Sequence, residues 1–138
     1  MTRYLLDTNI VSFLIKASYP ALDHRFSRVP KSSVFISTIC EAEVRFGLAL
    51  LPSQAKVHSV AENFLRDIEI ESWDSQCAKH YAVLAASQQN QGKPLSPLDT
   101  LIAAHALAHD FTLISNDKAF ARIKGLKVQD WTKGPQRA

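Results

Sequence analysis

The chain has 138 residues and a formal net charge of +3, and 46% of its residues are hydrophobic while 21% are charged. This composition is typical of one globular domain with a real core. It excludes a disordered chain. The sequence has no run of about 18 apolar residues, so no membrane span is predicted. The two cysteines, Cys40 and Cys77, are too few for a disulfide framework. They predict buried free thiols in a cytoplasmic protein.

The first predicted element is a buried strand over Tyr4–Leu6, which ends at Asp7 and precedes an amphipathic helix. Further strands are predicted at 34–37, 68–73, 111–115 and 126–128, and further helices at 20–28, 38–51, 53–67, 74–91, 97–109 and within 116–123. The charges that alternate along 68–73 favour an edge strand. Strands separated by helices predict an α/β fold, an α/β/α sandwich with a mainly parallel central sheet. We expect a single domain over 1–132 and a polar C-terminal tail over 133–138.

Asp7 is the first candidate functional residue, because it stands at the carboxyl end of a predicted strand. In open α/β sheets, ligands bind at that edge, where loops and helix N-termini converge. Aspartate is also among the best N-cap residues, and this position alone favours a cap for the helix that begins near Thr8. The functional interpretation depends on three further acids in comparable settings.

Glu43 is the second acid, and it lies on the apolar side of a predicted helix. Its neighbours three and four positions away are Ile39, Cys40, Phe46 and Gly47. A buried carboxylate without a partner is costly or shifts its pKa, so an acid on this side favours a functional role. The alternative is that Glu43 reaches solvent or meets an arginine. Glu41, three residues after Thr38, fits a structural capping box.

Asp99 and Asp117 complete the set. Asp99 is the third residue of a helix that begins after Ser96, an arrangement that a capping box explains fully. Asp117 follows the strand 111–115 with only Asn116 between them, and it precedes a short helix, so a cap explains it as well. Spacing alone does not decide between a cap and a ligand at either position.

Several carboxylates in one pocket repel one another unless a cation neutralises them. Mg²⁺ and Mn²⁺ prefer such hard oxygen ligands and keep several waters. Their sites activate water and stabilise charge on a phosphodiester, so the predicted substrate class is nucleic acid. Four polar residues beside the acids are candidates for orienting them or holding waters: Thr8, Ser37, Ser115 and Asn116.

Four motifs, taken together and in this order, resemble the PIN-domain ribonucleases, and among them the VapC toxins of bacterial toxin–antitoxin pairs. The motifs are Tyr-Leu-Leu-Asp-Thr-Asn-Ile at 4–10, Ile-Ser-Thr-Ile-Cys-Glu-Ala-Glu-Val-Arg-Phe-Gly at 36–47, Pro-Leu-Asp-Thr-Leu-Ile-Ala-Ala-His-Ala at 97–106 and Thr-Leu-Ile-Ser-Asn-Asp-Lys-Ala-Phe at 112–120. The resemblance continues to the closing stretch at 125–131 and so covers nearly the whole chain.

The resemblance implies a parallel-sheet sandwich and Mg²⁺- or Mn²⁺-dependent endonucleolytic cleavage of RNA. It implies that Asp7 and Asp99 are the main metal ligands, that Glu43 ligates metal or helps to deprotonate water, and that Asp117 completes the site. The fourth acid varies most within the family. The resemblance also implies a homodimer, inhibited by a VapB-like antitoxin whose C-terminal segment covers the pocket.

Two other functions remain open from the residues alone. One is a PIN-like module that binds RNA or a protein without catalysis, and the other is a different metal-dependent phosphatase or DNA nuclease. The stretch at 7–9 lacks the second aspartate of the Asp-x-Asp phosphatase motif, which disfavours that class. His105 and His109 are four residues apart on one predicted helix, a spacing that permits zinc, but we expect a surface or capping role for them.

Overall fold

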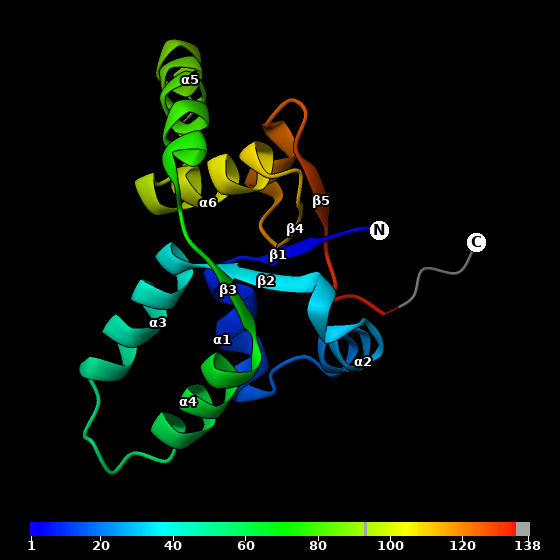
Figure 1. Ribbon diagram of the computed structural model, residues 1–138, viewed down its shortest axis with the longest axis vertical. Helices are drawn as coiled ribbons and strands as arrows, with labels where there is room; N and C mark the ends of the chain where they lie inside the picture. The colour runs from blue at the N-terminus through cyan, green and yellow to red at the C-terminus, as the bar shows by residue number, and fades with distance from the viewer. Residues whose placement is uncertain (93, 135–138) are drawn as a thin grey trace.

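The computed structural model describes residues 1–92 and 94–134 (Figure 1). Most of the predicted tail over 133–138 therefore lies outside the described residues. The strands are β1 (Tyr4–Leu6), β2 (Val34–Ser37), β3 (Glu69–Glu71), β4 (Thr112–Ile114) and β5 (Lys127–Gln129). The helices are α1 (Thr8–Lys16), α2 (Pro20–Arg28), η1 (Lys31–Ser33), α3 (Thr38–Ala49), α4 (Val57–Asp67), α5 (Ser75–Gln91), α6 (Pro97–Ala108) and η2 (Lys118–Arg122), of which η1 and η2 are 3₁₀ helices.

The five strands form one sheet in the order β3-β2-β1-β4-β5, and every pairing is parallel. This arrangement confirms the predicted parallel sheet and the edge position of β3. Tyr4 of β1 pairs with Val34 of β2 on one side and with Thr112 of β4 on the other. The chain thus leaves β1 toward β2 and later returns to its opposite side with β4. Ligands bind at such a switch point in open α/β sheets.

Helices cover both faces of the sheet. In Figure 1, α1, α3 and α4 lie on one side, and α5 and α6 on the other, with α5 projecting away from the body of the molecule. The core between these layers includes Leu5, Leu6, Ile36, Leu113 and Ile114, all essentially inaccessible to solvent. Among the described residues, no helix is long and apolar enough to cross a bilayer. Cys40 and Cys77 are buried free thiols, as predicted.

Most predicted elements differ from the structure by one or two residues at an end, and two differ by more. The helix predicted at 53–67 begins only at Val57, because the residues after Pro52 form turns before the helical repeat starts. The strand predicted at 68–73 is reduced to Glu69–Glu71, since only these residues pair with β2. Neither difference moves a candidate functional residue.

Candidate active site

Asp7 lies at the carboxyl end of β1 and is 3% exposed. Its Oδ1 accepts a hydrogen bond of 2.8 Å from the backbone N–H of Ile10, so the residue is indeed the N-cap of α1. The pKa of Asp7 is raised from 3.8 to about 6. Burial is the largest cause, hydrogen bonds from Ser115 and Ile10 oppose it, and the nearby charges of Asp99 and Asp117 add to it. A cap alone does not require this environment, because capping carboxylates normally remain in water.

Asp99 and Asp117 reach the same region from different elements. Asp99 is the third residue of α6, and its backbone N–H donates to the Ser96 hydroxyl over 3.2 Å, which confirms the predicted cap. Burial and the charge of Asp117 raise the pKa of Asp99. Asp117 follows β4 and caps η2, accepting a 2.9 Å hydrogen bond from the N–H of Ala119. The fold therefore brings Asp7, Asp99 and Asp117 within electrostatic reach of one another at the switch point.

Glu43 joins this region through Thr8. The Thr8 hydroxyl donates to the Glu43 carboxylate over 2.6 Å, so the first residue of α1 fixes the acid of α3 next to Asp7. Glu41, in contrast, pairs with Arg45 over 3.0 Å on the outside of the helix. The capping box predicted for Glu41 is wrong, because Ser37, not Thr38, caps α3 and Glu41 therefore lies one position beyond N3. The functional role predicted for Glu43 stays a prediction.

The predicted supporting residues have different roles. Thr8 orients Glu43, as described, and the buried Ser115 hydroxyl accepts a 3.0 Å hydrogen bond from the N–H of Asp117. Ser37 is fully buried and its Oγ accepts from the N–H of Ile39, which identifies it as a helix cap. Asn116 is half-buried between Ser115 and Asp117.

The spacing of the acids bears on the cation they suit. Among residues 1–92 and 94–134, no three of the four acids place one oxygen each within 4.8 Å of one another. The arrangement therefore does not form a closed cage of direct ligands. It fits an ion that takes a few carboxylates and retains its water, as Mg²⁺ does. Burial, together with repulsion between the carboxylates, raises the pKa values of Asp7 and Asp99, and hard oxygen donors in such a setting also fit a divalent cation.

A shallow apolar groove of about 200 Å³ begins beside Thr8 and Glu43 and continues between α1, α3 and α4. Its apolar lining includes Ile15, Val44, Leu48, Leu51, Val57 and Ala61. On α3 and at its C-cap, Phe46 and Leu50 are exposed at 67% and 71%. Exposed apolar surface of this kind, next to a polar site, is typical of a surface that binds a partner.

One sequence-based expectation is wrong. His105 was expected at the surface or in a capping role, but it is completely buried. The reason is that α6 is packed between α5 and the sheet and is buried on several sides at once. His109 does occupy the C-cap position of α6.

A parallel sandwich with acids gathered at its switch point is the architecture of a metal-dependent nuclease domain. The family model described as "PIN domain" matches residues 4–126. The chain is 33% identical over 132 residues to "Ribonuclease VapC1" of Haemophilus influenzae (strain R2866), a match that covers 94% of this chain and 98% of the relative. It is 30% identical over 132 residues to "tRNA(fMet)-specific endonuclease VapC" of Salmonella typhimurium, covering 95% and 99%.

The solved structures agree. The toxin–antitoxin structure described as "DNA bound VapBC from Salmonella typhimurium" contains a chain that superposes with a TM-score of 0.87 at 30% identity, covering 95% of this chain and 99% of that one. The protein belongs to the VapC group of the PIN-domain family.

Proposed function

We propose that the protein is a Mg²⁺- or Mn²⁺-dependent endoribonuclease that acts as the toxin of a toxin–antitoxin pair in the cytoplasm. The observation that carries the proposal is the convergence of Asp7, Asp99 and Asp117 at the switch point, with Asp7 buried and its pKa raised to about 6. A buried carboxylate beside two others is costly for the folded protein. A bound cation would offset this cost, and it would serve the cleavage of a phosphodiester substrate.

Each acid has a proposed role that its surroundings support. Asp7 and Asp99 would hold the metal, since both are partly or fully buried and both have a raised pKa. Glu43, fixed by Thr8, would orient the attacking water and take up its proton. Asp117 is exposed and would contribute through water. The bound cation would supply charge neutralisation and Lewis acidity at the phosphate.

The test is RNA cleavage by the purified chain beside its Asp7→Asn variant. We expect the parent to cut RNA only with added Mg²⁺ or Mn²⁺ and to leave DNA intact. The variant should lose at least about a hundredfold in rate, because a metal contributes several kcal/mol to such a reaction. Initiator tRNA should be tried first, since two relatives are named tRNA(fMet)-specific endonucleases.

The same experiment separates the other function classes. Equal behaviour of both folded proteins, with RNA bound but uncut, would indicate a binding module instead. Cleavage of DNA or of small phosphate esters would indicate another metal-dependent hydrolase. In cells, induction of the parent alone should arrest growth, and induction of the variant should not.

We also propose that a VapB-like antitoxin covers the groove between α1, α3 and α4. Support comes from the apolar lining of the groove and from its position beside Glu43, where an inserted segment would block access to the acids. Solved relatives were crystallised as toxin–antitoxin complexes. The oligomeric state proposed for the free protein is a homodimer, which light scattering on the purified chain tests directly.

A further inference from the structure

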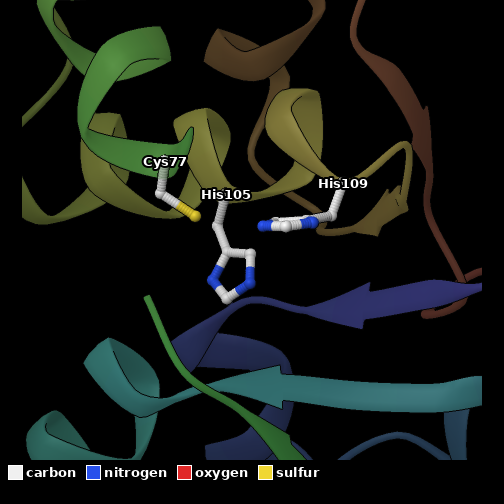
Figure 2. Close-up of side chains that lie close together, drawn as sticks. All are labelled: Cys77, His105 and His109. Atoms are coloured by element: carbon white, nitrogen blue, oxygen red, sulfur yellow. The ribbon is translucent and has the colours of Figure 1, made fainter. Parts of the chain in front are cut away.

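A second cluster of potential metal ligands lies in the α5–α6 layer, toward the end of α6 opposite Asp99. Cys77 of α5 and His105 and His109 of α6 place one donor atom each within 4.8 Å of one another. Figure 2 shows the Cys77 side chain and the His109 ring pointing toward each other, with the His105 ring next to them. Among residues 1–92 and 94–134, this is the one group of three or more His, Cys, Asp or Glu side chains that converges so closely.

His105 is the residue that makes this cluster unusual. It is fully buried, yet neither of its ring nitrogens has a hydrogen-bond partner among the described residues. Buried polar groups are nearly always paired, because leaving one without a partner costs about 1–3 kcal/mol. The Glu71 carboxylate approaches to 3.4 Å from Nε2, within ion-pair distance but without hydrogen-bond geometry. Nδ1 of His105 is therefore a buried donor atom without a partner, and Nε2 has only the long contact with Glu71.

We propose that Cys77, His105 and His109 bind a zinc-class divalent cation, a site separate from the carboxylate centre. One thiolate and two imidazoles suit Zn²⁺, whereas Mg²⁺ prefers oxygen. Tetrahedral zinc sites place their donors about 3.3–3.8 Å apart, so small side-chain rotations would bring these three donors into range. The two sites would thus be selective for different ions by donor chemistry.

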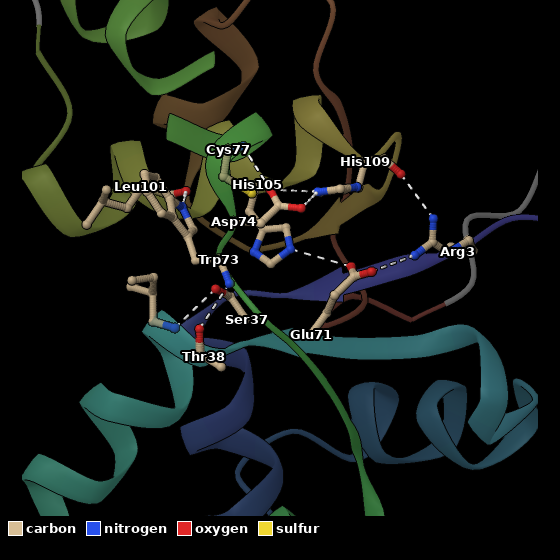
Figure 3. Close-up of polar contacts among 11 residues, drawn as sticks. Arg3, Ser37, Thr38, Glu71, Trp73, Asp74, Cys77, Leu101, His105 and His109 are labelled. Atoms are coloured by element: carbon tan, nitrogen blue, oxygen red, sulfur yellow. Dashed lines mark hydrogen bonds and ion pairs between the residues drawn. The ribbon is translucent and has the colours of Figure 1, made fainter. Parts of the chain in front are cut away.

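Two carboxylates beside the cluster strengthen the assignment. Asp74, the N-cap of α5, places its oxygens 2.9 and 3.0 Å from Nε2 of His109 and could supply the fourth ligand once that nitrogen turns to the metal (Figure 3). Glu71 faces Nε2 of His105 and is itself paired with Arg3. A metal bound through Nδ1 of His105 would leave the Nε2–H for Glu71, the carboxylate–histidine support common around bound zinc.

The consequence of such a site would be structural. The ligands come from the first turn of α5 and from the last turn and C-cap of α6. With four protein donors the site would be closed, as structural zinc sites are. It would tie the two helices of this layer to each other and, through Glu71, to the end of β3.

The test uses cobalt as a spectroscopic substitute for zinc on the full chain carrying Asp7→Asn, a substitution that removes a main ligand of the carboxylate centre so that this centre does not compete for the ion. We expect one equivalent of Co²⁺ to give the charge-transfer absorption of a cobalt–thiolate bond and the visible bands of tetrahedral cobalt, and Zn²⁺ to remove both. Cys77→Ser should abolish the thiolate band. His109→Ala should weaken Zn²⁺ binding by more than about a hundredfold, since even supporting residues contribute 10- to 100-fold.

Matched controls keep the result specific. Cys40→Ala removes the other buried thiol, and His80→Ala removes an exposed histidine of the same helix as Cys77. Both should retain the spectrum and the Zn²⁺ affinity. The proposal would be overturned by a folded protein that gives no thiolate band, or by zinc binding that survives both Cys77→Ser and His109→Ala. Because the readout does not involve RNA, it stands or falls independently of nuclease activity.

Discussion

Asp7 has one local property that stabilises the fold and one that destabilises it. Its Oδ1 caps α1, which stabilises the helix by about 1 kcal/mol. Its burial and its acidic neighbours raise its pKa from 3.8 to about 6, which corresponds to about 3 kcal/mol of lost stability once the group is ionised. Without a cation the charged residue therefore destabilises the fold on balance, as proteins often tolerate at active sites.

Asp7→Asn should stabilise the metal-free protein at neutral pH, because asparagine keeps the capping oxygen and removes the charge. The pKa of Asp7 is higher in the folded protein than its ordinary value of 3.8. Protonated Asp7 therefore favours the folded state below pH 3.8, and this contribution to stability is lost as the pH rises through about 6. We expect the variant to unfold at a higher temperature than the parent at pH 7.5, with the difference shrinking toward pH 4. Thermal denaturation with a chelator present measures this.

A matched control for this prediction is Asp67→Asn, which removes an exposed carboxylate. It should show no comparable pH-dependent gain. Added Mg²⁺ should raise the unfolding temperature of the parent at pH 7.5 and leave Asp7→Asn almost unchanged. If the variant is less stable than the parent at every pH, the buried charge is already compensated within the protein and the argument for a bound cation weakens.

Thr8→Val tests the orientation of Glu43. The substitution keeps the size and branching of the side chain but removes the hydroxyl that donates 2.6 Å to the carboxylate. We expect RNA cleavage to fall about 10- to 100-fold, the usual loss when a supporting hydrogen bond is removed, with little change in unfolding temperature. Asn9→Ala, which alters the exposed neighbouring residue, serves as the control; an equal loss there would show that the effect is not specific to the hydroxyl.

The positions of residues at strand ends and helix starts were predictable from the sequence. The burial of a residue was not predictable where it depends on packing between elements that are distant in the chain. Asp7, Asp99 and Asp117 follow strands or begin helices, so their positions were readable from neighbours. Their convergence was an inference that the strand order then supported. The burial of His105 was not readable, because it depends on α5 covering α6, and the Ala-rich sequence of α6 shows no clear exposed side.

At the scale of elements, α6 carries Asp99 in its first turn and His105 six residues later. Six residues span about 9 Å of helix, so the carboxylate centre and the proposed zinc site are two ends of one rigid segment. Helix ends were predicted well because caps and prolines mark them, as Ser96 and Pro97 do here. The start of α4 was predicted too early, because residues 53–56 contain no proline or glycine that would argue against a helix.

Ser96→Ala should show how far the position of Asp99 depends on its cap. The substitution removes the oxygen that accepts from the Asp99 N–H, and we expect about 1 kcal/mol of lost stability. A modest fall in Mg²⁺ affinity should accompany it, because the first turn of α6 would fray. Urea denaturation and magnesium titration measure the two effects. Ser32→Ala, at an exposed position in η1, should change neither.

At the scale of the molecule, the proposed antitoxin surface can be separated from the catalytic centre. Leu51 lines the groove and is 45% exposed, so Leu51→Glu should preserve folding and RNA cleavage. It should weaken the complex with the cognate antitoxin at least about tenfold, because a charge in the apolar centre of an interface is poorly tolerated. Calorimetric titration measures the affinity.

The control is Val83→Glu, which places the same charge on the exposed side of α5, where Val83 is 74% exposed. Antitoxin affinity should be unchanged. If Val83→Glu weakens the complex and Leu51→Glu does not, the antitoxin binds over α5 and the groove serves another purpose. This groove could not be predicted from the sequence, because residues of three separate helices, α1, α3 and α4, line it.

The two edges of the sheet limit how copies of this protein can associate. Both edge strands, β3 and β5, are only three residues long, and they carry Glu69, Glu71 and Lys127. Short, charged edges are poor templates for pairing with another strand and protect a protein from sheet-to-sheet aggregation and amyloid growth. A continuous intermolecular sheet is therefore disfavoured, and a stable assembly of this chain has to be built from its helices.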